Sequence, residues 1–250
     1  MSRRKFIFAL LLLLAVAAIA GKRPASAQDA SSSAPAPYAT MAPLKEYTIA
    51  DKAEELALAR SAAPKSISDD ADVLVLGGDG YTTAAKGTNG FVCMVQRSWA
   101  AATDFPEFWN PRIRAPICFN PAAARTYLPI VLMKTGMVVA GKSKAEIAQA
   151  VTSGLDSKQL PPVEPGAMCY MMSKHQYLAD DGMAWHPHMM WFVPGDASAT
   201  WGANLPGSPT IGANDPEERL TIFLVWVGHW SDGTPFSAAG HASHAAHKMN

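Results

Sequence analysis

The sequence predicts an α+β fold: an antiparallel β-sheet of about five to six strands, with two to three helices packed on one face. Two observations lead to this prediction. Short runs of β-branched and aromatic residues, separated by turns rich in Gly, Asn and Pro, occur before residue 100 and again after residue 168. Between them, two stretches with helical periodicity follow Asn120. Strands, then helices, then strands are typical of helices layered on an antiparallel sheet.

The 250-residue chain is predicted to begin with an export signal. A basic start, an apolar run over 6–20 and the sequence Ala25-Ser26-Ala27 predict a signal peptide over 1–27, cleaved near Ala27. A membrane anchor is the alternative, but the run is shorter than the roughly 20 apolar residues of a span. Residues 2–6 resemble a twin-arginine signal, whereas the Leu-rich run favours the general secretory route. We expect a periplasmic or extracellular protein that meets the membrane only during export.

Three further parts follow the signal. Residues 28–46 are rich in Ser, Ala and Pro and are predicted to be a flexible linker. Residues 47–236 are predicted to form a single α+β globular domain. The tail, 237–250, is predicted to be flexible. Its histidines at 241, 244 and 247 drift around a helix instead of forming one metal tripod, so weak metal affinity is the most we expect of them.

The charge of the mature chain argues against nucleic-acid binding. The whole chain has 21 basic and 21 acidic residues. Five of the basic residues and none of the acids precede the predicted cleavage point, which leaves 16 basic against 21 acidic residues, a net charge of −5. Phosphate binding needs clustered cations, and the sequence has no such patch.

The first half of the domain is predicted to be a helix followed by a meander. The helix is expected within 47–63, with Thr48 as its N-cap and Pro64 as the residue that stops it. Strands over 71–76, 81–86 and 91–98 are joined by short turns, the second of which contains Asn89-Gly90. Three strands joined in this way predict an antiparallel meander.

The second half is predicted to hold two helices and three strands. Residues 99–117, rich in Trp and Pro, are expected to form an ordered loop. One helix runs from Asn120 or Pro121 to 139, and the next over 144–153, with Ser143 and Glu146 as its capping box. Strands are predicted over 168–177, 188–193 and, as a central strand, 220–227; 196–218 is expected to be a long loop.

Several motifs, in order, resemble a family of small secreted bacterial proteins that has no assigned activity. They are GTNGFVCMVQR, PICFNPAAAR, MCYMMS and PHMMWFVP, and the resemblance covers roughly 49–227. It supports the fold and the compartment and implies no activity. Cys169 departs from the pattern, which has a small residue there, and the long loop with Trp resembles an insertion.

Three cysteines in an exported chain suggest one disulfide. We expect it between Cys93 and Cys118; two reduced core thiols are the alternative. Cys169 lies in an apolar strand, so we expect a buried free thiol there.

A soft-metal site is one candidate for function. If the two predicted strands that carry them pair, Met171, His186, His188 and Met190 would bring thioethers and imidazoles together, a ligand set that suits copper or zinc. The alternative is that these methionines fill the core.

Two further sets of residues could serve a ligand or a reaction. Arg97 and Arg125 could grip an anionic ligand, with Tyr170, Ser173 and His188 as further candidate ligand-binding residues. A hydrolase would use Ser173 with His188 or His175, oriented by Asp180 or Asp181. The chain has no G-x-S-x-G elbow, phosphate loop or Rossmann glycine pattern.

The sequence therefore favours a non-catalytic binding or envelope-associated domain over an enzyme. Its partner would be an envelope component or a small ligand, contacted through the loops 99–117 and 196–218. The first alternative is a copper or zinc protein, and the second is a hydrolase that no motif reveals.

Overall fold

The computed structural model describes residues 37–180 and 186–237, and in these ranges the fold is α+β. The signal peptide 1–27, Asp181 and the histidines of the tail lie outside the described residues. The helices are α1 (Lys52–Arg60), α2 (Lys65–Ser68), α3 (Pro121–Thr126), α4 (Leu128–Val139) and α5 (Lys144–Asp156), with short 3-10 helices η1 (Leu44–Glu46) and η2 (Ser98–Ala100).

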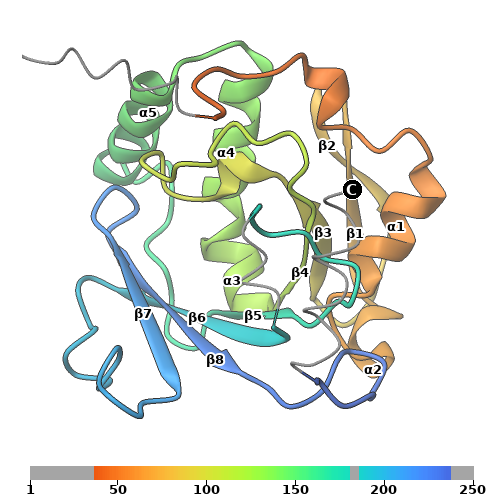
Figure 1. Cartoon of the computed structure of the whole chain (residues 1–250). Coiled ribbons are helices and arrows are strands. Elements are labelled where there is room, and N and C mark those ends of the chain that lie inside the picture. The colour runs from red at the N-terminus through yellow and green to blue at the C-terminus, as the bar shows by residue number, and fades with distance from the viewer. Residues whose placement is uncertain (1–36, 181–185, 238–250) are drawn as a thin grey trace, which may run out of the picture. The chain divides into compact units, whose positions relative to one another are not determined.

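The strands form one sheet of eight, in the order β2-β1-β3-β4-β5-β6-β8-β7 (Figure 1). They are β1 (Asp72–Gly77), β2 (Gly80–Ala85), β3 (Val92–Gln96), β4 (Ala115–Phe119), β5 (Met168–Met171), β6 (His188–Pro194), β7 (Thr210–Asp215) and β8 (Leu220–Trp226). The sheet is mixed: β1 and β3 pair in parallel, and the other neighbours are antiparallel.

The parallel pair corrects the predicted meander. Asn89-Gly90 does not close a hairpin; the Asn89 side chain donates to Ile67 O (2.7 Å) and accepts from Phe91 N (3.0 Å). Gly87 packs directly on the backbone of Asp70, where an added Cβ would overlap the carbonyl. The segment after β2 is thus held at the start of β1, and β3 runs alongside β1 in the same direction.

Capping residues and prolines set the helix boundaries, and only some of these boundaries were predicted from the sequence. Asp51, not Thr48, caps α1 by accepting from Ala53 N (2.8 Å). The single helix expected after Asn120 is two helices, because Pro129 has no N–H and its ring clashes with the preceding turn. Asn120 caps α3, and the capping box of Ser143 and Glu146 is present at α5.

One strand was missed. β7 lies inside the expected long loop, and it makes β8 the second strand from the edge, not a central one. Its sequence contains Gly212 and Asn214, which disfavour strands, so its pairing with β8 decides its structure. Asn204 covers the outer edge of β7: its side chain bonds to both Gly212 N (3.1 Å) and Gly212 O (2.8 Å). Its backbone N donates to Thr210 O (3.0 Å).

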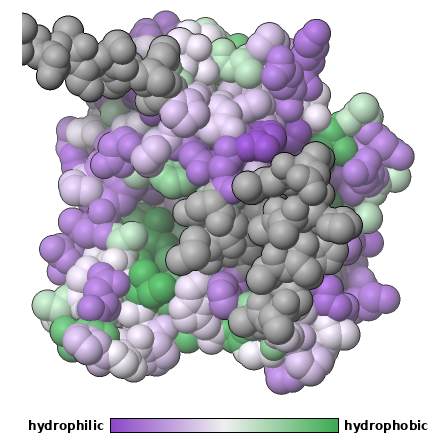
Figure 2. Space-filling model, in the orientation of Figure 1, coloured by the Kyte–Doolittle hydropathy of each residue, from purple (hydrophilic) through white to green (hydrophobic). Residues whose placement is uncertain are grey.

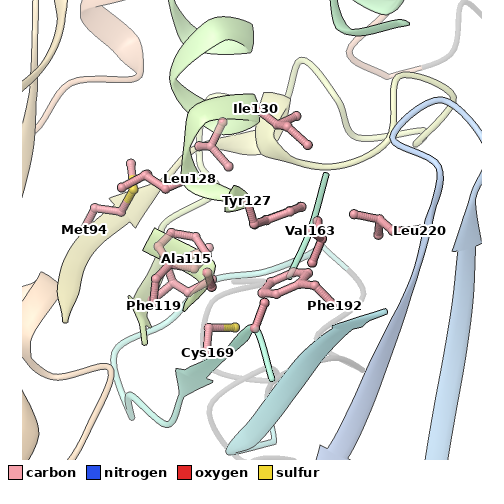
Figure 3. Close-up of a cluster of buried hydrophobic side chains, with 14 of the residues drawn as sticks. Met94, Ala115, Phe119, Tyr127, Leu128, Ile130, Val163, Cys169, Phe192 and Leu220 are labelled. Atoms are coloured by element: carbon pink, nitrogen blue, oxygen red, sulfur yellow. The ribbon is translucent and has the colours of Figure 1, made fainter. Parts of the chain in front are cut away.

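Helices cover both faces of the sheet, where one face was expected (Figure 1). On one face, Ala59 of α1 and the residues after it pack on Val73, Cys93 and Val95. On the other, side chains of α3 and α4 meet those of β3 to β6, and Tyr127 stacks on Phe192 with ring centroids 3.8 Å apart (Figure 3). The core is therefore two layers of side chains separated by the sheet.

Candidate functional site

The predicted disulfide is confirmed. Cys93 and Cys118 face each other directly across β3 and β4, and both are fully buried. This buried disulfide links β3 covalently to β4. Its presence is compatible with an oxidising compartment. Cys169 is a buried free thiol, as predicted, and burial raises its pKa far above the ordinary value.

The two arginines predicted to grip a ligand do not act together. Arg97 is 1% exposed, and its guanidinium bonds to Glu55 (2.8 Å), Tyr47 O (2.5 Å) and Val95 O. Arg125 is exposed on α3 and forms a two-pronged pair with Glu164, at 3.0 and 3.2 Å. Arg97 thus joins β3 to α1 inside the protein, whereas Arg125 makes an ordinary surface pair.

The strands that carry the candidate metal ligands do pair. Met171 lies opposite His188 and Cys169 opposite Met190, so Met171, His188 and Met190 share one face of the sheet. His188 is buried and its Nδ1 lies 2.7 Å from His186 O; burial lowers its pKa. The ring of His186 packs on Trp226 and Phe236. Within the described ranges, no three or more His, Cys, Asp or Glu side chains form a cluster suited to a metal ion.

Among the described residues, which do not include Asp181, no hydrogen bond links Ser173, a histidine side chain and Asp180 into a triad. Ser61 Oγ donates to Leu58 O (2.6 Å), so the hydroxyl of Ser173 donates to Ser61 Oγ (2.6 Å). Ser173 also accepts from the backbone N of His175 (3.1 Å), and its side chain is fully buried. Asp180 instead accepts from other side chains, those of Tyr38, Asn110, Arg112 and Tyr177. Tyr170 lies on the opposite face of β5 from Cys169 and packs near Phe91.

A groove of about 730 Å³ runs between α1 and the segment 173–177. Hydrogen bonds from Met172 N to Ala62 O and between Ser61 and Ser173 hold this segment beside α1. The lining mixes apolar and polar side chains: Ile49, Glu54, Ala57, Leu58, Ser61, Arg114, His175 and Tyr177. A concave site with an apolar wall and a few convergent polar groups is the usual form of a small-molecule site.

Arg114 is the half-buried cation in the wall of this groove, and the exposed Glu54 is the acid there. Arg114 precedes β4 and forms a backbone bridge with Tyr177, so the two side chains project from the same side of the pair. Its guanidinium donates only to backbone carbonyls: Pro111 O (2.7 Å), Ile113 O (2.8 Å) and Glu46 O (3.1 Å). These bonds fix the orientation of the cation, and none of them goes to a carboxylate of the described residues.

The electrostatics set Arg114 apart from its neighbours. Over 37–180 and 186–237, no carboxylate lies within ion-pair distance of it. Burial, followed by the nearby charge of Arg97, lowers the pKa of Arg114 to about 10. The group therefore remains a cation at neutral pH. A half-buried cation without a counterion offers an anion both charge and hydrogen-bond donors.

A smaller pocket of about 320 Å³ adjoins the groove and shares Ala57 and Ser61 with it. Arg60 and Lys65 line it together with Asp69 and Asp232. Asp232 is already paired with Lys174 at 2.7 Å. Arg60 has no ion pair among the described residues, and its buried Nε has no hydrogen-bond partner there.

A third cavity, of about 420 Å³, is lined mostly by apolar side chains of α5, the segment after it and the ends of β6 and β8. Figure 2 shows hydrophobic atoms gathered in a hollow below α5 and beside β7 and β8. The pair of Lys134 and Glu218 lies buried in the same region, 2.9 Å apart. The two charges of that pair neutralise each other, and Arg219 in the lining pairs with Asp156 at 2.6 Å. Lys158, the other cation of the lining, is exposed, whereas the cation in the wall of the groove is half-buried.

The loops expected to carry recognition differ in exposure. In 99–117 the aromatic residues Trp99, Phe108 and Trp109 are buried, so they belong to the core and not to a contact surface. In 196–218, Trp201 is 45% exposed and stacks on Phe223, and Leu205 is 61% exposed.

Arg114 and Arg60 were not predicted as site residues from the sequence, because nothing but their charge distinguishes them there.

Comparison of the chain with protein-family models, with curated proteins and with solved structures found no match. The resemblance to small secreted bacterial proteins stays a prediction. Across the described ranges, no helix is long and apolar enough to cross a membrane.

Proposed function

We propose that the chain is an exported, non-catalytic binding domain of the periplasm or cell exterior. The groove beside α1 takes a small ligand that has an apolar body and one anionic head. The anion contacts Arg114, and the body lies along Ile49, Leu58 and Tyr177.

The observation that carries this proposal is that Arg114, half-buried in the groove, has no ion-pair partner among the described residues. Burying a cation without a counterion costs free energy, and an anionic ligand removes that cost. The buried disulfide supports the export part of the proposal, because such bonds persist in oxidising compartments. In the described residues, Ser173 Oγ bonds to Ser61 Oγ and to the backbone N of His175 and not to an imidazole, which favours binding over hydrolysis.

Octanoate and octanol test the proposal, because they differ in the anionic head alone. We expect the purified chain to bind octanoate in calorimetry and to bind octanol much more weakly. Arg114→Gln should weaken octanoate at least about tenfold, because a charge-assisted hydrogen bond contributes on the order of 1.5 kcal/mol or more. Arg125→Gln, which removes an exposed and paired arginine, is the matched control. Equal binding of octanol, or an unchanged Arg114→Gln variant, would contradict the proposal.

A copper or zinc site is the second candidate, because Met171, His188 and Met190 share one face of the sheet. Metal analysis of the purified chain tests it. Stoichiometric copper or zinc that disappears in both Met171→Ala and His188→Ala would favour this candidate.

A further inference from the structure

The groove beside α1 has a cation at each end. Arg114 donates to Glu46 O, in the 3-10 helix that precedes α1, and so lies toward the N-terminal end of α1. Arg60 is the last residue of α1 and lines the adjoining pocket. The residues of α1 and its C-cap Ser61 that line the two pockets span 54–61, which corresponds to about 10 Å along the helix axis.

The two pockets adjoin each other along α1. Ala57 and Ser61 line both, so a ligand that reaches from one to the other passes two small side chains. The shared part is lined by the small side chain of Ala57 and the hydroxyl of Ser61, whose proton is donated to Leu58 O. The middle of the combined groove therefore offers no strong donor, which suits an aliphatic segment.

The lining of the far end contains two cations and two acids. Arg60 and Lys65 line it, and neither forms an ion pair in the part of the chain that the structure describes. The acids there are Asp232, held by Lys174 and by Thr234, and the exposed Asp69. Arg60 is half-buried, and its buried Nε lacks a partner.

We infer that the ligand is a linear dianion, with an aliphatic middle and an anionic group at each end. This inference rests on the proposed function, because it adds a second contact to the same groove. Arg114 binds one end, as proposed above. Arg60, assisted by Lys65, binds the other. Linear dicarboxylates are the simplest members of this class.

Octanedioate and octanoate separate this inference from the proposed function, because they share a chain length and differ by one carboxylate. We expect octanedioate to bind the purified chain about fivefold more tightly or better, the gain of one further half-buried charge pair. Arg60→Gln should abolish that gain and leave octanoate within about twofold of wild type, whereas Arg114→Gln should weaken both ligands. Succinate, which is too short to reach both cations, should show no gain.

The control is Lys52→Gln, which removes a cation of α1 that lines neither pocket. If octanoate binds and octanedioate gains nothing, or if Arg60→Gln weakens both ligands equally, the second subsite is wrong while the proposed function stands. If octanoate itself does not bind, both proposals fall together. Thermal unfolding of each variant shows whether the fold is intact. Lys65→Gln should reduce the gain of octanedioate over octanoate by less than Arg60→Gln does.

Discussion

Two arginines near α1, Arg97 and Arg114, differ in whether a carboxylate balances their charge. Toward the sheet, Arg97 is fully buried and its charge is matched by Glu55 at 2.8 Å. Toward the groove, Arg114 bonds only to carbonyls and has no carboxylate within ion-pair distance in the described ranges. A buried cation with its counterion serves the fold. One without a counterion, beside open space, is free to serve a ligand.

The largest expected effect comes from breaking the matched pair. Glu55→Ala leaves Arg97 buried and unpaired and removes the acceptor of Leu76 N, so we expect a loss of about 3–5 kcal/mol in the free energy of unfolding. Glu54→Ala changes the exposed neighbour and should stay within about 0.5 kcal/mol. Urea unfolding measures both. Similar losses for the two variants would show that the pair contributes little.

The disulfide gives the next largest effect. Replacing both Cys93 and Cys118 with Ala removes a link that closes 25 residues, and the chain-entropy model predicts a loss of about 3.5 kcal/mol. The measurement is the urea midpoint, compared with that of Cys169→Ala, whose thiol forms no link. An unchanged midpoint in the double variant would mean that the sheet holds β3 and β4 together without it.

A smaller effect on stability distinguishes the two arginines directly. We expect Arg114→Gln to change the free energy of unfolding by about 1 kcal/mol at most, because no counterion is stranded. Arg97→Gln strands Glu55 and should cost several times more. Thermal unfolding of the two variants side by side checks the difference. If Arg114→Gln proved as damaging as Arg97→Gln, the contrast between the two sides of α1 would disappear.

The smallest effect is a pH dependence at the wall of the groove. Asp180 accepts from Tyr177, whose ring lines the groove. Burial acts to raise the pKa of Asp180, but the hydrogen bonds from Tyr38, Tyr177 and Asn110 together hold it below the ordinary value.

A lowered carboxyl pKa stabilises the fold above the unfolded value of about 3.9, and that stabilisation is lost as the pH falls through the folded value. The difference in stability between wild type and Asp180→Asn should therefore be constant from neutral pH down to about pH 5 and shrink below pH 4. Urea midpoints across this range measure it. A difference that grows on acidification would have the wrong sign.

Local signals in the sequence predicted what local chemistry controls. Asn120 and the Ser143 capping box cap their helices as expected, and β6 and β8 lie where their apolar runs placed them. The disulfide was predicted from the export signal and the cysteine count. Each of these features depends on a few residues close in sequence or on the scarcity of cysteine.

The remaining features depend on partners far along the chain. β7 forms because β8 lies beside it, and β3 runs parallel to β1 because the segment 87–91 is anchored at Asp70 and Ile67. Arg97 and Arg114 look alike in the sequence. Their roles differ because Glu55, 42 residues away, forms an ion pair with Arg97, whereas no carboxylate of the described residues lies within ion-pair distance of Arg114. A single sequence does not reveal such pairings.

The position of Asn204 has a consequence for the behaviour of many copies together. An open strand edge invites a strand from another molecule, and repeated pairing of this kind builds fibres. The side chain of Asn204 already occupies the hydrogen-bonding groups of Gly212 on the outer edge of β7. At the β7 edge, a strand from another copy in a crowded solution therefore meets the amide of Asn204 in place of the free N–H and C=O of Gly212; β2 forms the other edge of the sheet.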